Sequence, residues 1–158
     1  MPTRNLSTDG MTDLGHAARR QLALKVLAQH AGPATGAEAL AAAAQRAYDD
    51  LARVSAPLIG QVGVDALTGR ALHLVRVEYP WLVATREPEQ AEGPFAQVIV
   101  RLGRQDPAVA TEAAGAVLAT LTGLFVTFIG EPLTARLLRK AWPDAFSDAN
   151  TPGDRRHD

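Results

Sequence analysis

The chain has 158 residues, of which 47% are hydrophobic and 21% charged, a composition typical of one globular domain with its own core. Its formal net charge of -1 gives no electrostatic reason to expect binding to nucleic acid or to an anionic membrane. Because the chain has no cysteine, disulfides, thiolate metal sites and cysteine catalysis are excluded.

The two ends of the chain differ from its middle. Residues 1–10 are polar and lack the apolar core of a signal peptide, so we expect a cytoplasmic protein with a disordered N-terminal segment. Residues 145–158, which are rich in Asp, Asn, Pro and Gly, predict a disordered C-terminal tail. One helical domain is then expected over residues 11–144. The preference for Arg and Ala is typical of a GC-rich bacterial genome.

The first part of this domain predicts two helices. The first is expected to begin at Thr12 or Asp13 and to reach about His30. Its buried side would consist of Leu14, Ala18, Leu22, Val26 and Leu27. The capping-box pattern of residues 35–38 begins a second helix, which is alanine-rich over residues 37–47 and is expected to break at the proline of residues 55–57.

The middle of the chain predicts two more helices. One is expected over residues 64–78, with its apolar positions at Val64, Leu67, Ala71, Leu72, Leu74 and Val75. Residues 85–94 carry three glutamates and predict a solvated acidic loop. Phe95, Val98, Ile99 and Leu102 recur at helical spacing and favour a helix over residues 94–104, while the β-branched run 98–100 is also compatible with a strand.

The most informative stretch covers residues 106–142. Asp106 and Pro107 are typical of a helix start, and Gly130 followed by Pro132 is typical of a stop and a new start. The uncharged residues 113–130 are long enough to span a membrane, but their threonines, alanines and glycines argue against a membrane-spanning helix. A shorter helix closed by residues 142–143 would bury Leu133, Leu137, Leu138 and Ala141.

These patterns predict an all-α, single-domain helical bundle of five to seven helices around a central apolar helix at about residues 107–129. Its core is expected at Val117, Leu121, Leu124, Phe125, Phe128, Leu133 and Leu137. The ridge of small residues Gly115, Ala119 and Gly123 is expected to pack on the alanine-rich face of residues 37–47. No internal repeat is evident.

Residues with recognisable chemistry are few. His73, with Arg76 one turn later, resembles the reactive histidine of histidine phosphotransfer domains, which lies on an exposed helix of a bundle near a basic residue. This resemblance implies a signalling module, but Val77 and Leu74 depart from the small and acidic residues usual there. The alternative is a partly buried histidine hydrogen-bonded to a neighbour.

Other site classes find no support in the sequence. His16, His30, His73 and His157 form no metal-binding spacing, so neither a metal nor another cofactor is expected. The low aromatic content of 5% argues against haem, and no nucleophile or phosphate-loop motif is present, so an enzyme is not indicated. A helix-turn-helix unit around Gly130 would place Arg136 and Arg139 inward, which makes a DNA-binding regulator a weaker alternative.

The sequence therefore predicts a non-enzymatic interaction or regulatory protein, with a second copy or another helical protein as its partner. Helices rich in alanine bury little area per residue, so one chain is expected to leave an apolar patch exposed, and a two-fold dimer is the commonest way to cover it. The expected contact residues are Ala39, Ala43 and Ala47 on the alanine-rich face, or Leu138 and Trp142 on the last helix. The alternative is that these surfaces pack within one chain.

Overall fold

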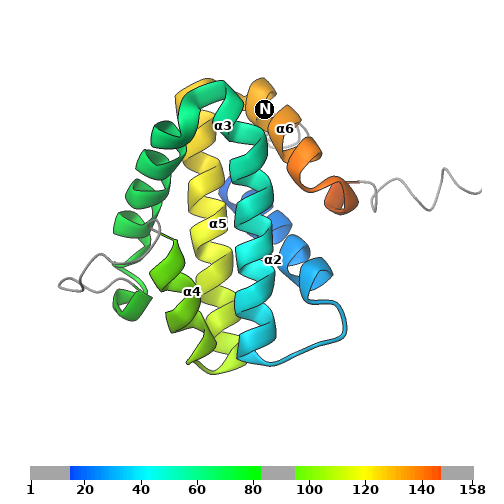
Figure 1. Cartoon of the computed structure of the whole chain (residues 1–158), viewed down its shortest axis with the longest axis vertical. Coiled ribbons are helices and arrows are strands. Elements are labelled where there is room, and N and C mark those ends of the chain that lie inside the picture. Colours follow the sequence, from blue (N-terminus) through cyan, green and yellow to red (C-terminus); the bar gives the residue numbers. More distant parts are fainter. Residues whose placement is uncertain (1–14, 83–94, 147–158) are drawn as a thin grey trace, which may run out of the picture.

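Helix α5 (Pro107–Ile129) runs through the middle of the molecule, and the other helices pack around it (Figure 1). This is a computed structural model, and it describes residues 15–82 and 95–146. The remaining elements are α2 (His16–Ala31), α3 (Ala37–Val75), the 3-10 helix η1 (Pro80–Leu82), α4 (Ala96–Gly103) and α6 (Glu131–Ala141). The predicted all-α bundle with a central apolar helix is confirmed. Residues 98–100, whose β-branched side chains were also compatible with a strand, lie in helix α4.

The ends of α5 follow the local sequence chemistry. The backbone N–H of Ala108 donates to Oδ2 of Asp106 at 3.2 Å, and Pro107, which has no N–H, occupies the first turn. Gly130 ends the helix at φ 94°, a backbone conformation that side-chain-bearing residues rarely adopt. Pro132 then lies in the first turn of α6, as the sequence predicts.

Helix α3 differs from its prediction. The helix does not break at residues 55–57 but continues through Pro57 and changes direction at Gly60, which has φ 83° and ψ 154°. Proline removes one hydrogen-bond donor, whereas only the glycine can take the positive φ that redirects the chain. The predicted second and third helices are therefore the two halves of α3, residues 37–59 and 61–75, and Leu74 of the second half is exposed.

The first half of α3 and helix α5 run in the same direction. A Cβ atom added at Gly103, the last residue of α4, would lie 3.9 Å from Cβ of Ala41, so α4 ends beside the start of α3. Helix α5 begins four residues later, at the same end of the bundle. At about 1.5 Å per residue, 23 residues extend each of the two helices by about 35 Å, and Figure 1 shows the bend of α3 and the end of α5 both at the upper end of the bundle.

The two glycines at this end form nearly identical junctions. Gly60 has φ 83° and ψ 154°, Gly130 has φ 94° and ψ 156°, and each follows an isoleucine and 23 helical residues. Buried residues recur in register 70 positions apart. The pairs are Leu40 and Ala110, Ala43 and Ala113, Ala44 and Ala114, Ala47 and Val117, Tyr48 and Leu118, Leu51 and Leu121, and Ser55 and Phe125. The structure thus contains a helix–glycine–helix repeat that the sequence analysis did not detect.

Most of the predicted core is buried, with Val117, Leu121, Phe125 and Leu137 in the interior. The prediction is wrong for Phe128, which is 61% exposed, because it lies in the last turn of α5 at the end of the bundle. Leu124 and Leu133 are partly buried. In α2, Val26 and Leu27 are buried and Leu22 is partly buried, whereas Ala18 is exposed and Leu14 lies outside the described residues.

The ridge of small residues on α5 faces α2 rather than the alanine-rich face of α3. A Cβ atom at Gly115 would lie 2.9 Å from Cδ2 of Leu24, and one at Gly123 would lie 3.0 Å from Cζ of Arg19. Long side chains of α2 therefore lie across the two glycines. The sequence correctly predicted a close approach of another helix to this ridge, but it predicted the wrong helix. Small residues allow a close approach and do not specify which helix approaches.

Three of the four buried serine and threonine hydroxyls have hydrogen-bond partners inside the helices, whereas Oγ1 of Thr134 has none in the described part of the chain. The hydroxyls of Ser55, Thr68 and Thr122 donate to the carbonyls of Leu51, Val64 and Leu118, at 2.7, 2.8 and 2.8 Å. The Thr68 hydroxyl also lies 3.0 Å from the hydroxyl of Tyr48, whose ring stacks on Phe95. These bonds remove most of the cost of burying hydroxyl groups.

Helix α5 has the length and the mean hydropathy, 1.7, of a helix that could cross a membrane. In the described part of the chain it is the one helix with these properties, and they are shared by core helices of soluble proteins. Of its most apolar stretch, 56% is buried inside the bundle. Packing against the other helices already accounts for more than half of that apolar surface.

Candidate interaction surface

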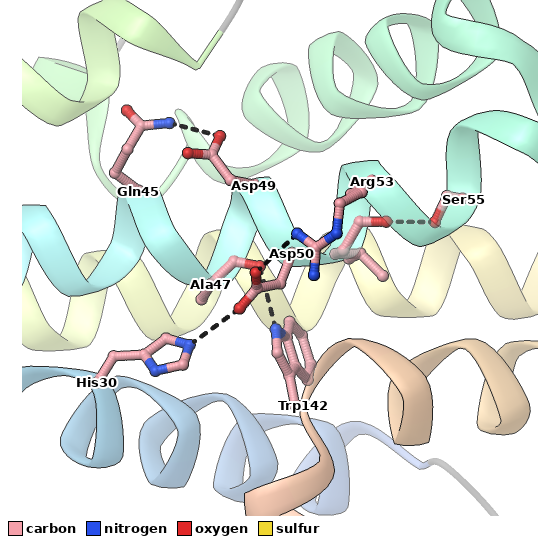
Figure 2. Close-up of polar contacts among 9 residues, drawn as sticks. His30, Gln45, Ala47, Asp49, Asp50, Arg53, Ser55 and Trp142 are labelled. Carbon is pink, nitrogen blue, oxygen red and sulfur yellow. Dashed lines mark hydrogen bonds and ion pairs between the residues drawn. The ribbon is translucent and has the colours of Figure 1, made fainter.

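A polar cluster links α2, α3 and α6 (Figure 2). Nε2 of His30, in the last turn of α2, lies 3.5 Å from Oδ2 of Asp50 on α3, and Nη1 of Arg53 lies 3.0 Å from the other carboxylate oxygen. Nη2 of Arg46 donates to the backbone carbonyl of His30 at 3.3 Å. The cluster therefore joins the end of α2 to the middle of α3.

In the described part of the chain, this histidine–aspartate pair lacks the neighbours that catalysis requires. Ser55, the serine drawn in Figure 2, is buried, and its hydroxyl donates to the Leu51 carbonyl, so it is not available as a nucleophile. Within residues 15–82 and 95–146, no group of three His, Asp or Glu side chains could hold a metal ion. The arrangement can therefore stabilise the helix junction, and it offers no reacting group.

His73, the histidine singled out in the sequence, is exposed on the second half of α3, and Arg76 is partly buried at the end of that helix. The partly buried histidine that the sequence left open as the alternative is thus not observed. Exposure makes the ring accessible to a partner, and a role in phosphotransfer stays a prediction. Arg136 and Arg139 are also exposed on α6, and DNA binding likewise stays a prediction.

Four of the five expected contact residues lie inside the single chain. Ala43, Ala47, Leu138 and Trp142 are buried, and Ala39 is partly buried. Nε1 of Trp142 donates to the Ala47 carbonyl at 3.0 Å, so α6 itself covers this part of the alanine-rich face (Figure 2). These side chains are not on the surface of the folded chain, because the chain's own last helix occupies the place expected for a second copy.

Apolar exposure is instead found beside the two glycine junctions, at one end of the bundle. Leu58, Val62 and Phe128 are 47%, 82% and 61% exposed. We call these three residues the kink-end patch. Leu58 and Phe128 occupy equivalent positions, each two residues before a junction glycine. That equivalence is a sequence signal that could have located the patch.

The two chain segments that carry the kink-end patch contain little charge. Residues 54–64 contain no charged side chain, and in residues 126–134 Glu131 is the one charged residue and is partly buried. Interface centres in known complexes are depleted of charge in the same way. An uncharged surface can also meet its own copy across a two-fold axis without like charges facing each other.

An open groove of about 490 Å³ lies between α3 and α4, and its lining includes Ala41, Gly103, Glu38 and Arg104. The groove is too open to exclude water from a bound small molecule.

No family model, curated protein or solved structure matches this chain.

Proposed function

We propose that this chain is a non-enzymatic helical interaction protein that self-associates through the kink-end patch. The observation that supports the proposal is the exposure of Leu58, Val62 and Phe128, which lie in two chain segments with little charge. Two of the three occupy equivalent positions in the helix–glycine–helix repeat. A two-fold contact would bury both copies of this surface against each other.

The size of the patch limits the affinity. Burying a large apolar side chain contributes about 1.5–3 kcal/mol, and six such side chains, each already partly covered, contribute on the order of 5–10 kcal/mol. Association itself costs about 4–15 kcal/mol. The most favourable of these values leave about 6 kcal/mol, so we expect a weak dimer, with Kd of about tens to hundreds of micromolar.

Sedimentation equilibrium over about 10 to 500 µM tests the proposal, a range that covers this affinity. The wild type should move from a mass of 16.7 kDa toward twice that value as concentration rises. The double variant Val62→Asp, Phe128→Asp should stay monomeric, because it places a charge at the centre of the contact. Val77→Asp is a matched control, since Val77 is 83% exposed but lies at the other end of the second half of α3.

Two results would reject self-association through this surface. One is a monomeric wild type throughout the concentration range. The other is equal weakening by Val77→Asp, which would show that any added charge disturbs the contact. Circular dichroism of each variant checks that the fold is retained.

The signalling alternative has one observation in its favour, the exposure of His73. A phosphorylated receiver domain incubated with the chain would then transfer a phosphoryl group to the ring, an increase of about 80 Da by intact mass. The increase should disappear in His73→Ala and remain in His16→Ala. An unchanged mass in the wild type would remove this alternative.

A further inference from the structure

We infer that the outer face of the second half of α3 is a docking surface for an acidic amphipathic helix of another protein. The face consists of Arg70, His73, Leu74, Arg76 and Val77, which we call the α3 outer strip. It is separate from the kink-end patch and does not depend on self-association. The inference rests on charge, exposure and helical spacing.

The spacing aligns these side chains on one side of the helix. Arg70, His73 and Val77 follow at intervals of three and four residues, and Leu74 is four residues after Arg70. Arg70 and His73 are exposed, Leu74 is 40% exposed, and Val77 just beyond the helix end is 83% exposed. Arg76 lies at the edge of the face and is partly buried.

The positive charges of the α3 outer strip are not neutralised within the described part of the chain. No hydrogen bond or ion pair joins Arg70, His73 or Arg76 to another residue there. Asp65, on the same half of α3, instead accepts a hydrogen bond from Gln61 at 2.9 Å. Glu78, four residues after Leu74 and exposed, lies at the other edge of the face. Among the described residues, the face thus presents Arg70 and Arg76 with one carboxylate at its edge and no ion pair that neutralises the arginines.

The combination of features selects the chemistry of the partner. Two arginines beside Leu74 and Val77 match a helix that carries carboxylates next to an apolar stripe. Nucleic acid would use the arginines but would leave Leu74 and Val77 exposed to water. The net charge of -1 gives no wider basic surface that could follow a phosphate backbone.

A designed peptide can serve as the probe. It is a fluorescein-labelled helix of about five turns, with leucines along one face and glutamates elsewhere, and its binding is followed by fluorescence anisotropy. We expect saturable binding that weakens as salt is raised from about 50 to 500 mM. The matched peptide with lysine at every glutamate should bind at least about tenfold more weakly.

Variants locate the contact on the chain. Arg70→Glu with Arg76→Glu should weaken binding of the acidic peptide about tenfold or more. Arg104→Glu with Arg136→Glu makes the same change in net charge on other exposed positions and should leave binding within about twofold of the wild type. Val77→Asp should weaken peptide binding without affecting self-association, and Val62→Asp with Phe128→Asp should do the reverse.

Several outcomes would overturn the inference. Equal binding of the acidic and basic peptides would show that charge does not select the partner, and equal loss in both double variants would show that only net charge matters. Absence of binding to the acidic peptide, together with arginine-dependent binding to phosphatidylglycerol vesicles, would assign the face to a lipid surface. Because the kink-end variants are measured separately, failure here leaves the proposed self-association intact.

Discussion

At the scale of single residues, the buried hydroxyl groups show how this core tolerates polarity. Tyr48, on the first half of α3, stacks on Phe95, and its hydroxyl lies 3.0 Å from that of Thr68 on the second half. Desolvation by burial is the main cause of a raised pKa for Tyr48, and nearby Asp65 adds to it, while the hydrogen bond to Thr68 opposes the rise. The phenol is therefore held in its neutral form.

Replacing Tyr48 with phenylalanine should lower the free energy of unfolding by about 1 kcal/mol at neutral pH, because one buried hydrogen bond is lost. The wild type should also lose stability above about pH 10, where the unfolded chain releases the phenol proton before the folded chain does. Phenylalanine has no ionisable proton, so the Tyr48→Phe variant should show a smaller alkaline loss.

Urea unfolding at pH 7 and at pH 10.5 (about half a unit above the ordinary tyrosine pKa) measures both effects. Tyr79→Phe provides the comparison, since Tyr79 also has a pKa raised by partial burial but lies near the surface. Equal alkaline losses in the wild type and in Tyr48→Phe would contradict the assignment of this pH dependence to Tyr48.

At the scale of elements, sequence patterns located the helices better than their junctions. The cap at Asp106 and the stop at Gly130 could be predicted because each depends on a few adjacent residues. The course of α3 could not, because Pro57 suggests a break while the actual turn depends on Gly60 adopting a positive φ. The partner of the α5 ridge also escaped prediction, since it depends on how α2 is placed.

Replacing two glycines of α3 with alanine should change the stability of the protein in opposite directions. Neither Gly60 nor Gly69 has another atom within 4 Å of an added Cβ, so space is not the limiting factor. Gly69→Ala should stabilise the protein by about 0.5–1 kcal/mol, because alanine has the higher helix propensity. Gly60→Ala should destabilise it by about 1–3 kcal/mol, because Gly60 has φ 83°.

Thermal unfolding of the two variants and of the wild type shows whether each substitution stabilises or destabilises the protein. A stabilising Gly60→Ala would mean that the bend in α3 does not require glycine. A destabilising Gly69→Ala would mean that this position is packed more closely than the surrounding side chains indicate.

At the scale of the whole molecule, the chain closes on itself where the sequence predicted a second copy. Trp142 donates to the carbonyl of Ala47, 95 residues earlier, and thereby fixes the end of α6 on the first half of α3. Ala43, Ala47 and Leu138, which the sequence marked as candidates for contact with a second copy, are buried within the single chain. The sequence could not tell contacts within one chain from contacts between chains, because both bury the same kinds of side chain.

Trp142→Phe should therefore lower the free energy of unfolding by about 1–2 kcal/mol, through loss of the indole N–H bond and of part of the buried ring. Trp81→Phe is the matched control, since Trp81 is the other of the two tryptophans and is only partly buried. Urea unfolding should be followed by circular dichroism, because removing a tryptophan changes the fluorescence signal itself. Equal effects of the two substitutions would indicate that the bond to Ala47 does not hold α6 in place.

The paired glycine junctions also determine the electric field at the kink end. A helix carries about half a negative charge at its C-terminus and half a positive charge at its N-terminus. At Gly60 and again at Gly130, the C-terminal pole of one helix lies next to the N-terminal pole of the next, so the partial charges cancel in pairs. The segments that expose Leu58, Val62 and Phe128 are thus weakly polarised as well as poor in charge, and removing water from them costs little electrostatic energy.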